Sequence, residues 1–166
     1  MIKLKPIQES EKENFIKNIQ TAFKKSAIDE FGDSDEEIIS RKEVIESFEM
    51  NGAETFNILL DEKIVGGIVV KIDRETNRNE LILFFVNVDC HSRGIGSEAW
   101  NQIEKMYPET KIWETVTPYF EKRNLHFYIN KCGFHIVEFF NPQHPDPNQD
   151  SEIGGDYFFR FEKVMK

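Results

Sequence analysis

The chain has 166 residues, which is long enough to bury a core and short enough to form one domain. Hydrophobic residues make up 39 % of it and charged residues 31 %, a composition typical of a folded domain and not of a disordered chain. The formal net charge of −9 excludes a general nucleic-acid binder, because phosphate backbones are held by basic patches. An acidic surface suits a cationic or amine substrate, and it is also an ordinary device for solubility.

The cysteine count and the first residues predict a reduced, cytoplasmic protein. The two cysteines, Cys90 and Cys132, form no Cys-x-x-Cys pair, so we expect free thiols and neither a metal nor a redox site. The opening Met-Ile-Lys-Leu-Lys-Pro has no apolar run followed by a cleavage site, and no later segment approaches a membrane-spanning length. We therefore expect no membrane partner.

The first third of the chain is predicted to form a short strand and two helices. The strand covers residues 2–5. Residues 10–13 (Ser-Glu-Lys-Glu) match a capping box that opens a helix with one apolar side, ending near Lys25. Residues 34–37 (Ser-Asp-Glu-Glu) match a second capping box, whose helix ends at Asn51-Gly52.

Three strands and a third helix are predicted next. The segments 56–60 and 64–72 are β-branched and apolar, and Asp61-Glu62-Lys63 between them suits a hairpin turn. A third long strand covers 80–88. A helix is predicted next, and Pro108 ends it. The prediction rests on apolar residues at helical spacing: Ile95, Ala99, Ile103 and Met106.

The last third alternates strands with one more helix. Residues 111–116 predict a buried strand, and Thr117-Pro118 a helix start. Gly133 supplies a left-handed end to that helix, whose apolar face is spaced i, i+3, i+4 and i+7: Leu125, Tyr128, Ile129 and Cys132. The remaining segments are two strands and a Pro-, Asn-, Asp- and Gly-rich loop: strands 134–140 and 157–163, and the loop 141–156.

The stretch from Val86 to Ser97 carries the strongest functional signal. It joins an apolar strand to a helix through a turn that contains Gly94 and Gly96, which let the backbone bend tightly and approach a ligand. The free amides and the dipole of the following helix favour an anion there. The sequence therefore predicts a phosphate site where the middle strands of an α/β sheet with an antiparallel first half end.

This element order resembles the GNAT superfamily of acyl-CoA-dependent N-acetyltransferases. The likeness rests on two segments: His91-Ser92-Arg93-Gly94-Ile95-Gly96, and Asn124 to Tyr128 followed by Gly133-Phe134. It spans nearly the whole chain and implies one acetyltransferase domain over residues 1–166. The implied fold is α/β (α+β), with a mixed, centrally splayed sheet of about seven strands flanked by about four helices.

The resemblance implies acetyl-CoA as the co-substrate, with no metal. His91 stands where the family has Gln or Arg, and Val88 where many members have proline; backbone amides make most of the contact, so neither departure abolishes phosphate binding. The cofactor-binding residues it implies lie on the strand, the turn and the last helix: Phe84, Val86, Val88, His91, Ser92, Arg93, Gly94, Ile95, Gly96, Ser97 and Asn124. The alternative for Asn124 is an ordinary surface residue of a helix. The side chains of Phe84 and Val86 are expected to lie in the core, so their role in binding would come from the backbone.

A dinucleotide-binding turn is the competing interpretation of the glycines, because Gly94 to Ala99 fits Gly-x-Gly-x-x-Gly/Ala and Glu114 follows at a suitable distance. In that fold the first glycine follows its strand almost directly, whereas residues 89–93 intervene here. It also needs several parallel strand-helix units, and the chain before Glu80 predicts two helices and a hairpin instead. A plain tight turn is the simplest alternative.

Two residues are candidates for catalysis. The resemblance implies that Tyr128 is the general acid that protonates the departing thiolate, for which a phenol is suited. Glu80 lies eleven residues before His91, the spacing of a general-base glutamate in the histone-type branch of the family, and its apolar neighbours predict a raised pKa. The alternative for Tyr128 is an ordinary tyrosine on the apolar face of its helix. The alternative for Glu80 is an exposed charge at a strand end, with an ordered water acting as the base.

The expected acceptor is a primary amine of a small molecule or peptide, bound by the first two helices and the loop before Tyr157. A non-catalytic acyl-CoA-binding sensor is the alternative from another class, since a fold does not guarantee turnover. The aromatic segments 139–140 and 157–159 predict either core or the face of a homodimer.

Overall fold

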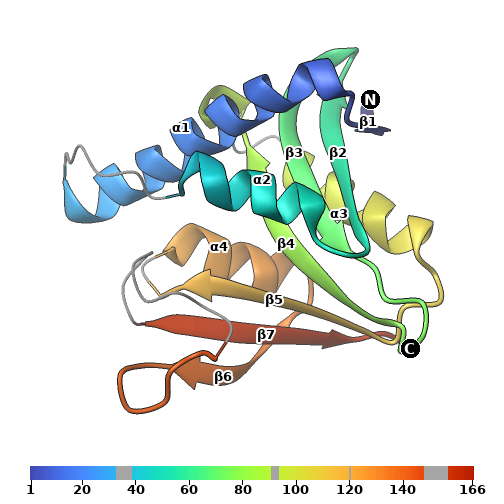
Figure 1. Cartoon of the computed structure of the whole chain (residues 1–166). Coiled ribbons are helices and arrows are strands. Elements are labelled where there is room, and N and C mark those ends of the chain that lie inside the picture. The colour runs from blue at the N-terminus through green and yellow to red at the C-terminus, as the bar shows by residue number, and fades with distance from the viewer. Residues whose placement is uncertain (33–38, 91–93, 120, 148–156) are drawn as a thin grey trace.

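The computed structural model describes residues 1–32, 39–90, 94–119, 121–147 and 157–166. Within them lie seven strands in one mixed sheet, ordered β1-β2-β3-β4-β5-β7-β6, and four α-helices (Figure 1). The strands are β1 (Ile2–Pro6), β2 (Ala53–Leu60), β3 (Lys63–Lys71), β4 (Arg78–Val86), β5 (Ile112–Pro118), β6 (His135–Phe140) and β7 (Phe158–Val164). The helices are α1 (Lys12–Phe31), α2 (Arg41–Glu49), α3 (Ile95–Met106) and α4 (Lys122–His126). This architecture confirms the fold expected from the resemblance.

The first four strands form an antiparallel meander. Asp61 and Glu62 connect β2 to β3 with φ angles of 50° and 72°, so the predicted turn is a two-residue hairpin of the kind that matches strand twist. β3 then pairs antiparallel with β4. A doubly wound dinucleotide fold needs parallel units here, so this half of the sheet is incompatible with it.

The sheet splits between β4 and β5. The two strands pair in parallel only over Arg78–Glu80 and Ile112–Glu114. Just beyond, the Thr115 hydroxyl donates a hydrogen bond to the Leu81 carbonyl at 2.9 Å. In Figure 1 β4 and β5 meet at the lower right and spread apart toward the left. The result is a V-shaped opening, the central splay that the resemblance implied.

A bulge in β4 decides which side chains face which helices. Val69 pairs with Leu83 but Val70 pairs with Leu81, so β4 carries one extra residue there and its alternation changes phase. Leu81 packs in the core beside α3, and Phe84 lies on that same side, whereas Phe85 faces α1. Because of the bulge, even-numbered side chains at the end of β4 face α3.

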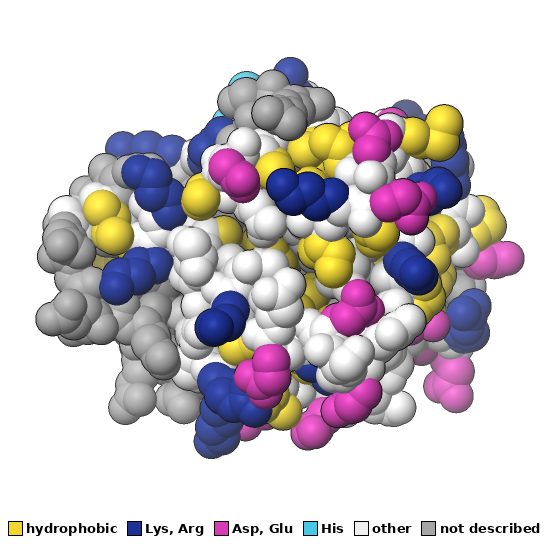
Figure 2. Space-filling view, turned by 90° about the horizontal axis from the view of Figure 1, so that it is seen from above, with side chains coloured by type: hydrophobic (Ala, Val, Ile, Leu, Met, Phe, Trp, Pro, Cys, Tyr) yellow, Lys and Arg dark blue, Asp and Glu magenta, His cyan; other side chains and the backbone are white. Residues whose placement is uncertain are grey.

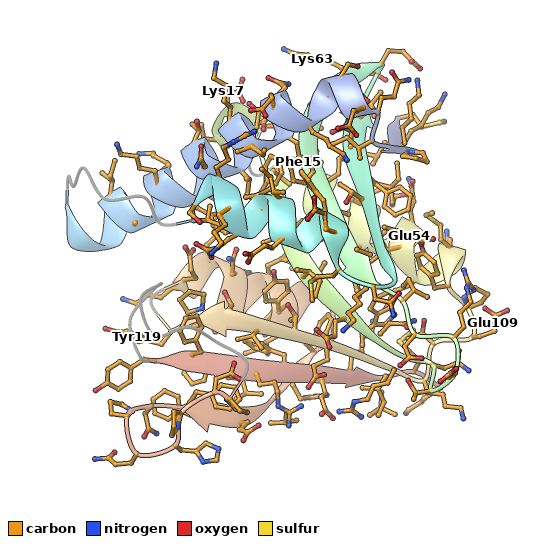
Figure 3. The ribbon with its side chains drawn as sticks, viewed as in Figure 1. Phe15, Lys17, Glu54, Lys63, Glu109 and Tyr119 are labelled. Carbon is orange, nitrogen blue, oxygen red and sulfur yellow. The ribbon has the colours of Figure 1, made fainter. Side chains whose placement is uncertain are left out.

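Helices cover the two faces of the sheet with separate cores. α1 and α2 cover one face through Phe15, Ile19 and Val44, which meet Val69 and Phe85. Figure 3 shows Phe15 between α1 and α2. The other core joins α3 to the C-terminal half: its largest fully buried members are Trp100, Trp113, Phe134 and Phe161.

The helix boundaries in the first half differ from the prediction. The N-terminal capping box is formed by Gln8 and Glu11, not by Ser10 and Glu13, and a 3-10 turn precedes α1. α1 runs past Lys25 to Phe31 and ends at Gly32 with a φ of 85°. The predicted box at 34–37 lies outside the described residues; α2 begins instead after a box of Ser40 and Glu43.

The region after β5 also corrects the prediction. Thr117-Pro118 does not start a helix: both residues remain in β5, opposite Phe159 and Phe158 of β7. α4 begins at Lys122 and passes into a π-helical turn over Phe127–Lys131. The wider turn rotates the side chains, so Ile129 is 37 % exposed instead of joining the apolar face.

The sequence predicted β5 to be a buried strand, but in the structure only one of its faces is covered. Trp113, Thr115 and Thr117 face the core, while the side chains between them lie on an uncovered face. There Arg160 of β7 pairs with Glu114 at 2.5 Å and with Glu138 of β6 at 2.8 Å. No helix in the described part of the chain is long and apolar enough to cross a membrane.

Candidate active site

A cleft of about 320 Å³ occupies the open end of the V between β4 and β5. Its walls are the end of β4, part of α1, the start of α3 and the length of α4 with its π turn. Among the residues that line it are Phe84, Gly94, Gly96, Arg123, Asn124, Phe127 and Lys131. The cleft therefore lies at the strand ends where the sequence predicted a phosphate site.

The start of α3 presents its free amides to this cleft. Gly94 is the N-cap residue and has a φ of 71°, in the left-handed region that glycine tolerates. Gly94, Ile95, Gly96 and Ser97 all line the cleft, and the first amides of a 12-residue helix have no partner within it. The helix dipole adds partial positive charge at this end. The arrangement is suited to hold an anion.

Gly96 has a packing role that its sequence motif did not indicate. A Cβ at this position would lie 3.1 Å from two ring carbons of Phe127 and 3.5 Å from the ring of Phe84. Those two rings contact each other, with centroids 5.3 Å apart. Phe127 thus bridges α3 and β4, and a side chain at residue 96 would require the Phe127 ring to move by a few tenths of an ångström.

The predicted cofactor-binding residues are mostly brought together. Phe84, Val86, Ser97 and Asn124 line the cleft along with the two glycines and Ile95. Val88 is an exception: β4 ends at Val86, and Val88 lies in a 3-10 turn, 37 % exposed and outside the cleft. His91, Ser92 and Arg93 lie outside the described residues.

Tyr128 lies in the core beneath the cleft and does not line it. Its side chain is 5 % exposed and packs against Phe134 and Phe161, with ring centroids 5.8 Å and 5.6 Å away. Burial raises the pKa of the Tyr128 phenol above its ordinary value, and nearby Cys132 and Glu121 raise it further. The hydroxyl is hydrogen-bonded with Thr115, whose own hydroxyl links β5 to β4 at the base of the V.

Glu80 lies at the paired end of the V, next to Glu114. Since Leu81 faces the α3 core, Glu80 points to the opposite side, toward α1 and α2. Partial burial raises the pKa of the Glu80 carboxyl; Glu114 adds to this effect, and Lys71 and Arg78 oppose it. Its carboxylate has no hydrogen bond or ion pair with another described residue.

Three cleft residues that the sequence analysis did not select come from α4 and its π turn: Arg123, His126 and Lys131. A signal for them exists, because residues 122–131 contain Lys122, Arg123 and Lys131 and no acid, in a chain with 30 Asp and Glu. Cys90 also lines the cleft; its thiol is buried and is not part of a disulfide. Cys132 lies outside it, and burial raises the pKa of its thiol to about 12.

A splayed mixed sheet with a helix N-terminus at the open end defines an acetyltransferase fold of the GNAT type. The model of the acetyltransferase (GNAT) family matches residues 16–134, and the chain belongs to this family.

One curated protein is similar in sequence, and solved structures are similar in fold. The uncharacterized protein YrkN of Bacillus subtilis (strain 168) is 51 % identical over 168 residues, covering 96 % of this chain and 91 % of YrkN. The ribosomal-protein-S18-alanine N-acetyltransferase of Escherichia coli has a similar fold, with a TM-score of 0.73, 10 % identity, and coverage of 100 % and 95 % of the two chains. The PaiA N-acetyltransferase of Thermoplasma acidophilum, solved in complex with coenzyme A, gives a TM-score of 0.69, 16 % identity and 99 % coverage of each chain.

Proposed function

We propose that residues 1–166 form one acetyltransferase domain that moves the acetyl group of acetyl-CoA directly to a primary amine. The observation that carries the proposal is the cleft itself, in which unpaired amides of α3 face a row of basic side chains on α4 across the open V. A diphosphate with a long, mostly uncharged arm suits such a site. The neighbour solved with coenzyme A supports the same choice of donor.

The donor would lie along the V with its diphosphate at the start of α3. The amides of residues 95–97 would hold it, together with residues 91–93, which precede them in the sequence. The pantetheine arm would run beside Phe84 and Val86, and Asn124 would contact it from α4. The thioester would then point toward the base of the V, where β4 and β5 pair.

The chemistry requires one bond to form and one to break. The amine nitrogen attacks the thioester carbonyl, the carbon–sulfur bond breaks, and the amine loses a proton. The backbone amide of Phe84, beyond the point where β4 leaves β5, would stabilise the oxyanion. Glu80, or a water beside it, would accept the amine proton, and the raised pKa of the Glu80 carboxyl favours that role.

Tyr128 would act on the leaving sulfur from below the cleft. Its hydroxyl lies by Thr115, close to the point at which the strands separate. Because burial raises the pKa of Tyr128, the phenol stays protonated at any ordinary assay pH. It would therefore donate a hydrogen bond to the departing thiolate, whereas the raised pKa makes the phenol a weaker acid and opposes complete transfer of its proton.

The amine acceptor would approach from the side of α1 and α2, since Glu80 faces that side. The formal net charge of −9 would favour a cationic acceptor.

Two measurements test this function. Calorimetry with acetyl-CoA should show saturable binding, and release of free thiol in the presence of a panel of small and peptide amines should identify an acceptor. Tyr128→Phe should keep donor affinity within about twofold while acetyl transfer falls by about 10²- to 10⁴-fold. No heat with millimolar acetyl-CoA would refute the proposal. Binding without transfer to any amine would favour a sensor.

A further inference from the structure

One wall of the cleft carries a row of basic side chains to which the proposed mechanism assigns no individual contact. Arg123, His126 and Lys131 line the cleft from α4 and its π turn, opposite the start of α3. At 1.5 Å per residue, Arg123 and Lys131 are about 12 Å apart along the helix, with Phe127 between them. Both residues line the same cleft and both are exposed, and their long side chains are of a length to reach one group between them.

The side chains of Arg123 and Lys131 are available to a ligand. Neither makes an ion pair or a side-chain hydrogen bond with another described residue. By contrast, Arg78 and Arg160 both pair with Glu162 at 2.5 Å. Figure 2 shows one face of the molecule on which acidic and basic side chains are intermixed, so uncompensated positive charge is not the general pattern there.

Among the described residues that line the cleft Glu121 is the one acid, and it does not neutralise this row. Glu121 lies at the N-cap of α4 and is only 6 % exposed, whereas Arg123, His126 and Lys131 are exposed at the rim. The rim of α4 is therefore positive in a chain whose net charge is −9. A ligand that reaches this rim meets cations first.

We propose that this row binds a second phosphate of the donor: the 3′-phosphate monoester on the ribose of coenzyme A, apart from the diphosphate at α3. The inference rests on the proposed function. A phosphate monoester carries close to two negative charges at neutral pH and offers three acceptor oxygens, which suits a guanidinium fork joined by an ammonium group. The cleft then selects donors that carry this phosphate over those that lack it.

The test compares coenzyme A with dephospho-coenzyme A, which differs only by that phosphate. Calorimetry at one fixed ionic strength gives both dissociation constants for the wild type, Arg123→Gln, Lys131→Gln and the double variant. The wild type should prefer coenzyme A by about tenfold or more, the factor for losing one hydrogen bond to a charged group. The double variant should lose about that factor for coenzyme A and less than about twofold for the dephospho form.

Lys122→Gln is the matched control, because it removes the same charge from the neighbouring position outside the cleft. It should leave the ratio of the two constants unchanged. Equal wild-type affinity for both ligands, or an equal loss for both in the double variant, overturns the inference while coenzyme A binding, and with it the proposed function, stands. Failure of both ligands to bind the wild type overturns the proposed function as well.

Discussion

Gly94 offers a direct test of the turn on which donor binding depends. It is the N-cap of α3, with φ 71° and ψ 10°. A Cβ built there meets no atom within 4 Å, so a substitution adds no steric clash. Gly94→Ala should therefore report backbone strain alone, which costs an L-residue about 1–2 kcal/mol in the left-handed region.

The cost converts to a shift in melting temperature. For a chain of this length, 1 kcal/mol lowers Tm by about 2–4 °C, so Gly94→Ala should melt about 2–8 °C below the wild type. Thermal unfolding followed by circular dichroism without ligand measures this, since a bound ligand would add its own stabilisation. Asparagine tolerates the left-handed region and caps helices well, so Gly94→Asn is the matched control and should lose less than about half as much.

Two results would refute this reasoning. If Gly94→Ala melts with the wild type, residue 94 does not need the left-handed conformation. If Gly94→Asn is destabilised as strongly as Gly94→Ala, the loss comes from the added side chain and not from the backbone. In either case the start of α3 would not be the tight turn on which the donor site is built.

Three further predictions concern Glu80, Tyr128 and Gly67. The folded-state pKa of the Glu80 carboxyl is raised, so ionised Glu80 lowers the free energy of unfolding above that pKa. Below about pH 4.5 the carboxyl is protonated in both the folded and the unfolded state, and the effect is absent. Urea titrations should show Glu80→Gln more stable than the wild type at pH 7, with the difference vanishing as the pH falls; an undiminished difference at pH 4 would contradict this. If Glu80 is the base, kcat/KM should rise with pH through a pKa above the ordinary carboxyl value, and Glu80→Gln should abolish that limb. Because the pKa of Tyr128 is raised, its ionisation should produce no fall in acetyl transfer up to pH 10. A fall that the wild type shows below pH 10 and that Tyr128→Phe does not show would mean that the phenol is accessible to solvent. A Cβ on Gly67 would lie 2.2 Å from the Phe15 ring, so Gly67→Ala should lose about 1–3 kcal/mol in urea unfolding, and Phe15→Leu in the same chain should recover part of it; a neutral Gly67→Ala would show that this core is loosely packed.

The sequence predicted the elements whose signals are local. The hairpin at Asp61 and Glu62 depends on a short polar turn between β-branched runs, and α3 on apolar spacing after a glycine. Both are where they were expected. Element boundaries were less accurate, because they depend on partners far along the chain: Pro118 stays in a strand since β7 pairs with it from forty residues away.

The candidate site was predicted in part. The glycine turn and Asn124 do line one cleft, because the motif that carries them is contiguous with the elements that position them. The depth of Tyr128 was not predictable from spacing, since it depends on Phe134 and Phe161 packing around it. The basic row on α4 was missed because only the three-dimensional arrangement turns Arg123 toward α3.

The π-helical turn at Phe127–Lys131 bears on how this chain is compared with other acetyltransferases. A π turn takes one more residue than an α turn to advance the same way. An ordinary helix with one residue deleted after Tyr128 would keep both the phenol below the cleft and Gly133 at its end. Alignments should place a single-residue gap inside this helix and not in the loop after it; otherwise the residues from Ile129 to Gly133 are matched one position out of register, although Tyr128 stays aligned.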